Sequence, residues 1–162
     1  DPDDPFNTGL LSDVVAAAAT RYRSEDIALD VVVAALDDSP EPVVPRSPEF
    51  LHGLGNVIQN AVQFGQRVVS VEVSWDENEA RVEVRDDGRG FPPGVLDRVG
   101  EPYISNRGDG HLGLGIFIAQ TLLERTGARI RFSNIREAGR ASGAEVVIIW
   151  RRDMLEVTRG KG

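Results

Sequence analysis

The chain contains no cysteine, which excludes disulfide bonds and thiol chemistry from this stretch of sequence. No apolar run approaches the roughly 18 residues of a membrane-spanning helix, and no signal peptide is visible. Basic residues are in the minority, because 18 Lys and Arg stand against 26 Asp and Glu, for a net charge of -8. Nucleic acid, which is held by clustered basic side chains, is therefore not the expected partner.

What is present suits one soluble globular domain of 162 residues, with 41% hydrophobic and 27% charged residues. We expect residues 1–8 to be a lead-in or linker, residues 9–153 to form the domain, and residues 154–162 to be a tail. The chain opens at Asp1 rather than Met, so we expect a piece of a longer protein. A cytoplasmic location is expected for it, and the parent can still be anchored to a membrane.

Hydrophobic periodicity predicts helices and strands in alternating groups. The expected order is a helix at 10–23 capped by Thr8 or Ser12, a strand at 27–35, a short edge strand within 39–45, a helix at 47–65, strands at 68–75 and 80–86, a loop at 91–112, a helix at 114–126, and strands at 128–135 and 144–150 around a 139–143 turn. This order predicts an α+β two-layer sandwich, in which about three helices cover one face of a mixed, largely antiparallel sheet.

The first functional signal is a polar stripe on the helix at 47–65. Ser47 followed by Pro48 is a typical helix start, and the apolar residues of the helix fall on one broad arc. Asn56, Asn60 and Gln63 fall on the opposite side. An asparagine oxygen is a hard neutral ligand for Mg²⁺, although such a stripe on an isolated helix is more often only solvated.

The second signal is an acid at the buried side of a strand. Alternation along 80–86 directs every second residue inward and ends on Asp86, while Asp87 is expected to be an ordinary exposed turn residue. A buried carboxylate needs a donor, and the amino group of adenine is such a donor. Gly88 and Gly90 allow the backbone to approach a flat ring closely.

The third signal is a glycine-rich segment, from Gly110 to Gly115, at the start of a helix. Free N–H groups at a helix N-terminus attract phosphates. The segment is neither a Walker loop nor a dinucleotide fingerprint, because no Gly-Lys-Ser/Thr follows it and no strand precedes it. The 91–112 loop before it is long enough to be a functional lid.

In this order the three signals resemble the ATP-binding domain shared by gyrase, heat-shock chaperone, histidine kinase and mismatch-repair ATPases. LGNVIQNAVQFG is similar to the N-box of bacterial sensor histidine kinases, VRDDGRGFP to their first glycine box, EPYISNR to the start of their ATP lid, and GHLGLGIFIAQTLLERTGA to their second glycine box. The last stretch also resembles the redox-responsive RegB/PrrB/ActS group. The absence of cysteine gives redox sensing no support.

The resemblance implies a role for each matching residue. Asn60 is expected to bind Mg²⁺ and Asp86 to bind adenine beside Gly88 and Gly90. Asn56, a supporting amide, and Arg107 are expected to be the catalytic residues. The remaining contacts to ATP phosphates are expected from Ser105, Arg107, Gly110, His111, Leu112, Gly113, Leu114 and Gly115.

Three departures from the family pattern sharpen the expected function. Family helices often carry lysine where Gln63 stands, so the phosphate charge is expected to be met elsewhere, for example by Arg107. Relatives that hydrolyse ATP carry a glutamate base four residues before the metal-binding asparagine, and here Asn56 cannot accept a proton. Neither His52 nor His111 has the context of the phospho-accepting histidine, which in the family lies on a dimerising helical hairpin.

We therefore expect the catalytic domain of a sensor histidine kinase, which binds Mg-ATP and passes the γ-phosphate to a histidine on a separate dimerisation domain. The resemblance implies a response regulator as the further partner, a homodimeric parent and a monomeric fragment. A serine kinase that switches an anti-sigma partner, and a nucleotide-binding module without catalysis, are the alternatives.

Overall fold

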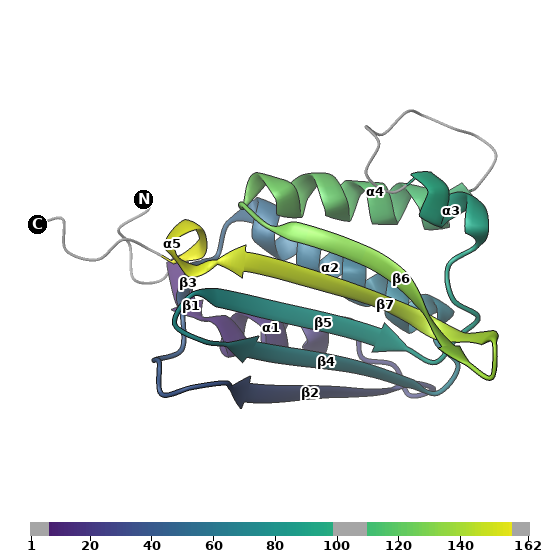
Figure 1. Ribbon diagram of the computed structural model, residues 1–162, viewed down its shortest axis with the longest axis horizontal. Helices are drawn as coiled ribbons and strands as arrows, with labels where there is room; N and C mark the ends of the chain where they lie inside the picture. Colours follow the sequence, from purple (N-terminus) through teal and green to yellow (C-terminus); the bar gives the residue numbers. More distant parts are fainter. Residues whose placement is uncertain (1–6, 99–109, 157–162) are drawn as a thin grey trace, which may run out of the picture.

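Alternating apolar and polar residues build a five-stranded sheet in the computed structural model, which describes residues 7–98 and 110–156 without the side chains of residues 98, 110–114 and 141 (Figure 1). In spatial order the strands are β2 (Ala28–Ala35), β4 (Val68–Trp75), β5 (Glu79–Asp86), β7 (Arg140–Arg151) and β6 (Arg129–Glu137). Only the pair β2 and β4 is parallel, and the other three pairs are antiparallel. The predicted mixed, largely antiparallel sheet is confirmed.

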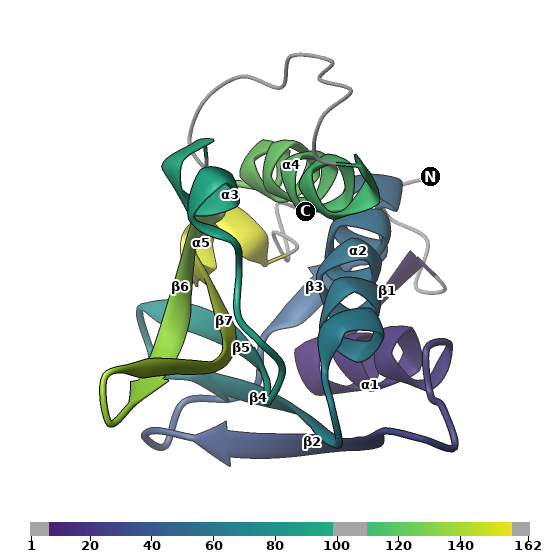
Figure 2. The ribbon, with the colours of Figure 1, turned by 90° about the vertical axis from the view of Figure 1, so that its right-hand side faces the viewer.

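Three helices cover the concave face of this curved sheet, as predicted (Figure 2). They are α1 (Leu11–Thr20), α2 (Pro48–Phe64) and α4 (Gly110–Arg125), and α2 lies between the other two. Smaller elements complete the described fold: strands β1 (Thr8–Leu10) and β3 (Val43–Pro45), which pair with each other, and helices α3 (Pro93–Arg98) and α5 (Arg152–Leu155). The α+β class is confirmed.

Helix α2 begins where its sequence predicts. The Ser47 side chain accepts a hydrogen bond from the Phe50 N–H at 3.2 Å, and Pro48 occupies the first turn, where no N–H is needed. Helix α1 differs from expectation. Neither Thr8 nor Ser12 caps it, because Thr8 pairs in β1 and the Glu41 carboxylate accepts the Ser12 N–H at 2.6 Å.

The core lies between the helices and the inward row of each strand. On β5 this row is Ala80, Val82, Val84 and Asp86, all buried as the alternation predicts. Arg81, Glu83 and Arg85 point to the other face, where they form ion pairs with each other and with Glu145. The Phe50 ring of α2 packs at 5.4 Å from Trp150 of β7 and joins the middle helix to the sheet.

Two boundaries differ from the predicted ones. The β6–β7 hairpin turns at Ala138 and Gly139, whose φ angles of 52° and 78° suit the tight turn that matches strand twist. Residues 140–143, predicted as part of the turn, therefore belong to β7, and the β6–β7 register has an irregularity between Ile135 and Arg136. Helix α4 starts at Gly110 rather than Leu114, because a glycine costs a helix only about 1 kcal/mol and does not by itself stop it.

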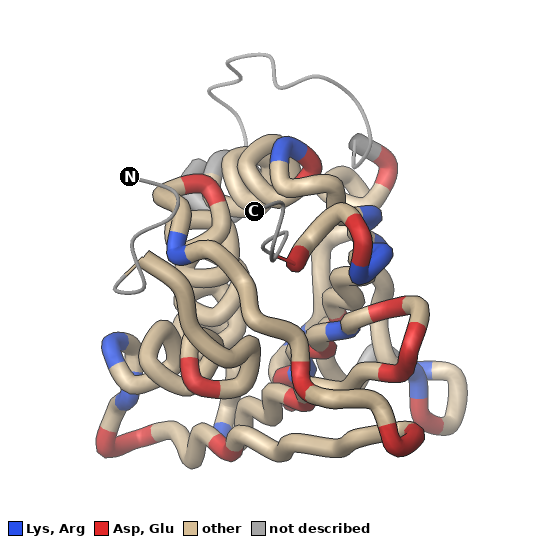
Figure 3. The backbone as a smooth tube through the Cα atoms, turned by 90° about the vertical axis from the view of Figure 1, so that its left-hand side faces the viewer, with Lys and Arg blue, Asp and Glu red and all other residues tan. Residues whose placement is uncertain are grey.

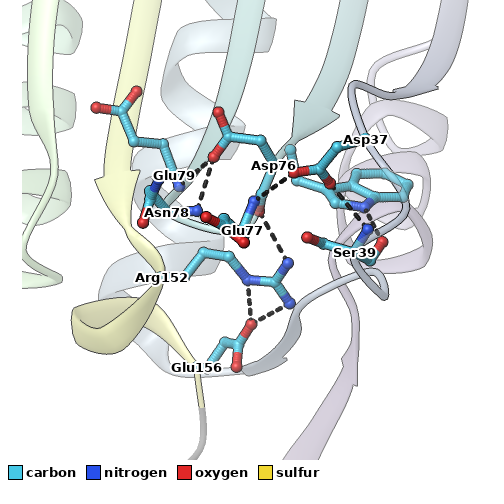
Figure 4. A network of polar contacts seen from close by, with 9 residues as sticks. Asp37, Ser39, Asp76, Glu77, Asn78, Glu79, Arg152 and Glu156 are labelled. Carbon is cyan, nitrogen blue, oxygen red and sulfur yellow. Dashed lines mark hydrogen bonds and ion pairs between the residues drawn. The ribbon is translucent and has the colours of Figure 1, made fainter.

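The end of the sheet away from β5's last residue is closed by a polar network (Figure 4). The Asp37 carboxylate accepts the N–H groups of Ser39 and Glu77, and so joins the segment after β2 to the β4–β5 turn. The Arg152 guanidinium donates to the Asp76 carbonyl at 3.0 Å and forms an ion pair with Glu156. Seen from this end, acidic and basic positions are interspersed along the turns (Figure 3).

Within residues 7–98 and 110–156, no helix has the length and apolar character needed to cross a bilayer.

Gly53 controls how closely α4 approaches α2. A Cβ at this position would lie 2.6 Å from Cγ of Leu123, which is fully buried. We expect Gly53→Ala to lower the free energy of unfolding by about 1–2 kcal/mol, since overpacking outweighs the gain in helix propensity. Gly94→Ala in α3 is the control, because a Cβ there meets nothing within 4 Å. Equal stability of the two variants in urea unfolding would contradict this packing.

Candidate nucleotide site

A small cavity lies where the last residues of α2 and β5 meet. The arrowhead of β5 in Figure 1 marks this end of the sheet. Its volume is about 10 Å³, room for about one water molecule. It is lined by Asn60, Phe64, Asp86, Gly90, Phe91 and Ala144. The carboxylate predicted to bind adenine and the amide predicted to bind Mg²⁺ thus face the same cavity.

Asp86 is the buried charge of this cavity, with 6% of its surface exposed. Its Oδ1 accepts the N–H of Gly88 at 2.8 Å and the N–H of Ala144 at 3.3 Å. Burial raises the pKa of Asp86, and the charge of Asp87 adds to the rise, against the lowering effect of these two N–H groups. Among the described residues, both hydrogen bonds to the Asp86 carboxylate are thus accepted by the same oxygen.

Two glycines let the backbone close around Asp86. A Cβ on Gly88 would lie 2.1 Å from the Phe64 carbonyl oxygen, and a Cβ on Gly143 would lie 1.9 Å from the Asp86 carbonyl oxygen. Gly88 was expected from its motif. Gly143 was missed, although a glycine inside a strand pattern signals a close backbone approach.

A second missed residue is Asn134 of β6. Its side chain accepts the Phe91 N–H at 2.6 Å and donates to the Phe91 carbonyl at 3.0 Å. The signal in the sequence is that Asn134 occupies an inward position of its strand, in line with Ile130 and Phe132. A polar side chain at an inward position needs a partner, and here the partner is the wall of the cavity.

The polar stripe of α2 reaches the cavity only at its last turn. Asn60 is half-buried and lines the cavity, whereas Asn56, one turn earlier, is half-buried and does not. Gln63 and His52 are exposed. Phe64, which was missed, has 42% of its surface exposed and forms one wall of the cavity. Its signal was an aromatic residue four positions after Asn60.

Asp87 is not the ordinary exposed turn residue that was expected. Its carboxylate accepts the N–H groups of Gln66 at 2.8 Å, Arg67 at 3.0 Å and Val68 at 3.2 Å. Partial burial acts to raise the pKa of Asp87, but these hydrogen bonds outweigh it and hold the pKa below its ordinary value. Asp87 therefore ties the α2–β4 connection to the end of β5.

The glycine-rich segment differs from the expected loop, because it forms the first turns of α4. Only the first N–H groups of a helix lack an intrahelical acceptor, so the N–H of Gly115 belongs to the helical ladder. A Cβ on Gly115 would meet nothing within 4 Å, so this face of the helix is open. The structure describes the backbone but not the side chains of His111, Leu112 and Leu114, and Ser105 and Arg107 lie outside the described residues.

Known proteins share both the sequence pattern and the fold. Residues 47–153 match the family described as histidine kinase-, DNA gyrase B-, and HSP90-like ATPase. The chain belongs to this ATPase family. It is 35% identical over 170 residues to the sensor histidine kinase RegB of Cereibacter sphaeroides, which covers 93% of this chain and 37% of RegB. The chain thus spans about a third of the length of these curated relatives.

Other relatives agree with this assignment. Sporulation kinase A of Bacillus subtilis is 33% identical over 88 residues, 53% of this chain and 14% of that protein. The mycobacterial sensor histidine kinase MprB has the same fold, with a TM-score of 0.70 over 89% of this chain and 97% of its own at 22% identity. The catalytic domain of histidine kinase ThkA gives a TM-score of 0.67 at 17% identity, over 90% and 95% of the two chains. The resemblance to histidine kinase ATP-binding domains, and to RegB among them, is confirmed.

Charge neutralisation at Asp86 should stabilise the domain in the absence of nucleotide. In Asp86→Asn the side-chain oxygen can still accept from Gly88 and Ala144, and the buried charge is gone. We expect Tm to rise at neutral pH, by about 2–4 °C for each kcal/mol gained. Because the pKa of Asp86 is raised in the folded state, the wild-type domain loses stability as the pH rises from 3.8 through that pKa. The difference in Tm between the variant and wild type should therefore vanish at lower pH. A lower Tm for the variant at pH 7 would contradict this account.

Asp87 should show the opposite pH dependence, because its folded pKa is lowered. Its stabilisation is present above the unfolded value of 3.8 and is lost as the pH falls through the folded pKa. We expect Asp87→Asn to lower the free energy of unfolding by about 1–2 kcal/mol at pH 7, with the difference narrowing in acid. Urea unfolding between pH 3 and pH 7 measures the difference in free energy of unfolding between wild type and variant. A difference that widens in acid would refute the stabilising role of Asp87.

Proposed function

We propose that this domain binds Mg-ATP and donates the γ-phosphate to a histidine on a separate dimerisation domain in two-component signalling. A response regulator then receives the phosphoryl group. The observation that carries the proposal is the shared cavity of Asp86 and Asn60, which offers one acceptor for a purine and one neutral ligand for Mg²⁺. Such a reaction belongs in the cytoplasm, where ATP and the regulator are available.

The base end of the site suits adenine. Oδ2 of Asp86 accepts the exocyclic amino group, while Oδ1 remains held by Gly88 and Ala144. Phe64 is exposed enough to rotate and cover the face of the ring, which an aromatic side chain stabilises by stacking. A purine is much larger than the 10 Å³ cavity, so a wall must move when the base enters. Phe64 is the exposed wall.

The phosphate end lies along α2. Asn60 would supply an oxygen ligand to Mg²⁺, which when bound would neutralise the triphosphate charge. The residues that the structure describes hold no group of three or more His, Asp or Glu that could bind a metal alone. Asn56 supports the site as an amide one turn earlier, and Ser105 and Arg107 reach the terminal phosphate. The segment Gly110 to Gly115, with His111, Leu112, Gly113 and Leu114, completes the phosphate contacts.

In the transfer, the bond between the γ-phosphorus and the bridging oxygen breaks, ADP leaves, and a bond from phosphorus to an imidazole nitrogen forms. The protein contributes positioning and charge neutralisation. An amide at Asn56 cannot take a proton from water, so hydrolysis by the domain alone should be very slow. Neither His52, exposed on α2, nor His111 is proposed as the acceptor.

Calorimetric titration with ATP, with and without Mg²⁺, tests the two ends separately. Asp86→Asn places an amide donor against the adenine amino group and should weaken binding at least about tenfold in both conditions. Asn60→Ala should weaken binding only when Mg²⁺ is present. Gln59→Ala, an exposed neighbour on the same helix, is the control. The domain with added dimerisation domain should label a histidine from γ-labelled ATP. Unchanged affinity in both site variants, or fast hydrolysis by the domain alone, would overturn the proposal.

A further inference from the structure

The Asn134 side chain makes the hydrogen bonds to the first glycine box that the backbone of a neighbouring strand would otherwise make. One carboxamide satisfies both backbone groups of Phe91, with Oδ1 accepting from the N–H at 2.6 Å and Nδ2 donating to the carbonyl at 3.0 Å. The two residues are 43 positions apart in the sequence. A loop that would otherwise have solvated backbone is thereby fixed to β6 at two points.

Next to this contact, the backbone of Gly90 has a left-handed conformation. Its φ is +83°, and a Cβ there would lie 2.7 Å from Oδ1 of Asn134. A side chain at position 90 and the Asn134 hydrogen bonds therefore exclude each other. The Phe91 ring adds a further attachment, because it is 4% exposed and meets the Phe132 ring edge-on at 5.9 Å.

The same residue is tied to the buried carboxylate. Asn134 on β6 pairs with Ala144 on β7, and the Ala144 N–H donates to Oδ1 of Asp86. Gly90, Phe91, Asp86 and Ala144 all line the cavity. One cross-strand pair thus connects two walls of the cavity, whereas Phe64, a further wall, has 42% of its surface exposed.

We propose that Asn134 is a positioning residue for recognition of the base, because it fixes the Gly90–Phe91 wall relative to Asp86. This inference rests on the proposed nucleotide-binding function. The base enters against the fixed Gly90–Phe91 wall, and the Phe64 side chain moves to make room for it. Loss of the Asn134 hydrogen bonds releases the Gly90–Phe91 wall and weakens contacts with the base, while contacts with the phosphates stay as they are.

Asn134→Ala, which removes both hydrogen bonds, and Asn134→Asp, which keeps only the one from the Phe91 N–H, test this role. Ser133→Ala is the matched control, since Ser133 is the neighbouring residue, is exposed and points to the other face. In titrations, Asn134→Ala should weaken adenosine and Mg-ATP by about the same factor, on the order of tenfold, and Asn134→Asp, which sets a carboxylate oxygen against the Phe91 carbonyl, should also weaken both. Binding of Mg-tripolyphosphate, which has no base, should not change.

Hydrogen exchange of the Phe91 N–H gives a second readout that needs no nucleotide. Protection should be present in wild type and Asn134→Asp and lost in Asn134→Ala. An unprotected Phe91 in wild type, unchanged adenosine affinity in both variants, or an equal loss for adenosine and tripolyphosphate would each overturn the positioning role. Failure of wild type to bind any adenine nucleotide would instead refute the proposed function, and the exchange result would still decide whether Asn134 fixes the wall.

Discussion

The buried carboxylate of Asp86 is the constraint on which this end of the molecule depends. It continues the apolar inward row of β5, and among the described residues two backbone N–H groups hold it, both on one oxygen. Burial therefore raises the pKa of Asp86 and works against folding at neutral pH. Proteins keep such costs mainly at functional sites, where a ligand supplies the missing partner. Here Asp86 lines a cavity that Asn60 also lines.

The surroundings of Asp86 are built to hold it there. Gly88 lets the segment after β5 approach the end of α2, and Gly143 lets β7 approach the end of β5, within distances that a Cβ forbids. Asp87, its neighbour, accepts three N–H groups and fixes the α2–β4 connection. The two adjacent acids thus have opposite pKa shifts, one raised by burial and one lowered by hydrogen bonds. The second acid thus stabilises the frame around the first.

Local patterns were enough to predict much of this arrangement. The Ser47 cap, the alternation that ends on Asp86 and the hairpins all depend on residues close in the sequence. The features that were missed depend on distant pairs. Asn134 meets Phe91 across 43 residues and Asp86 meets Ala144 across 58, so these contacts depend on how β7 pairs with β5 and with β6. The start of α4 was placed too late because glycine propensity is a weak signal.

In the proposed function, Asp86 holds the adenine end and Asn60 the Mg²⁺ end of one Mg-ATP molecule. Nitrogen-resolved NMR of the wild-type domain, titrated first with adenosine and then with a non-hydrolysable ATP analogue and Mg²⁺, tests it directly. Adenosine should shift the backbone N–H signals of Gly88 and Ala144, which report on Asp86, and leave the Asn60 side-chain amide nearly unchanged. The analogue with Mg²⁺ should shift all three signals. Shifts at Asn60 without any change at Gly88 and Ala144, or no shift at either end, would contradict the account.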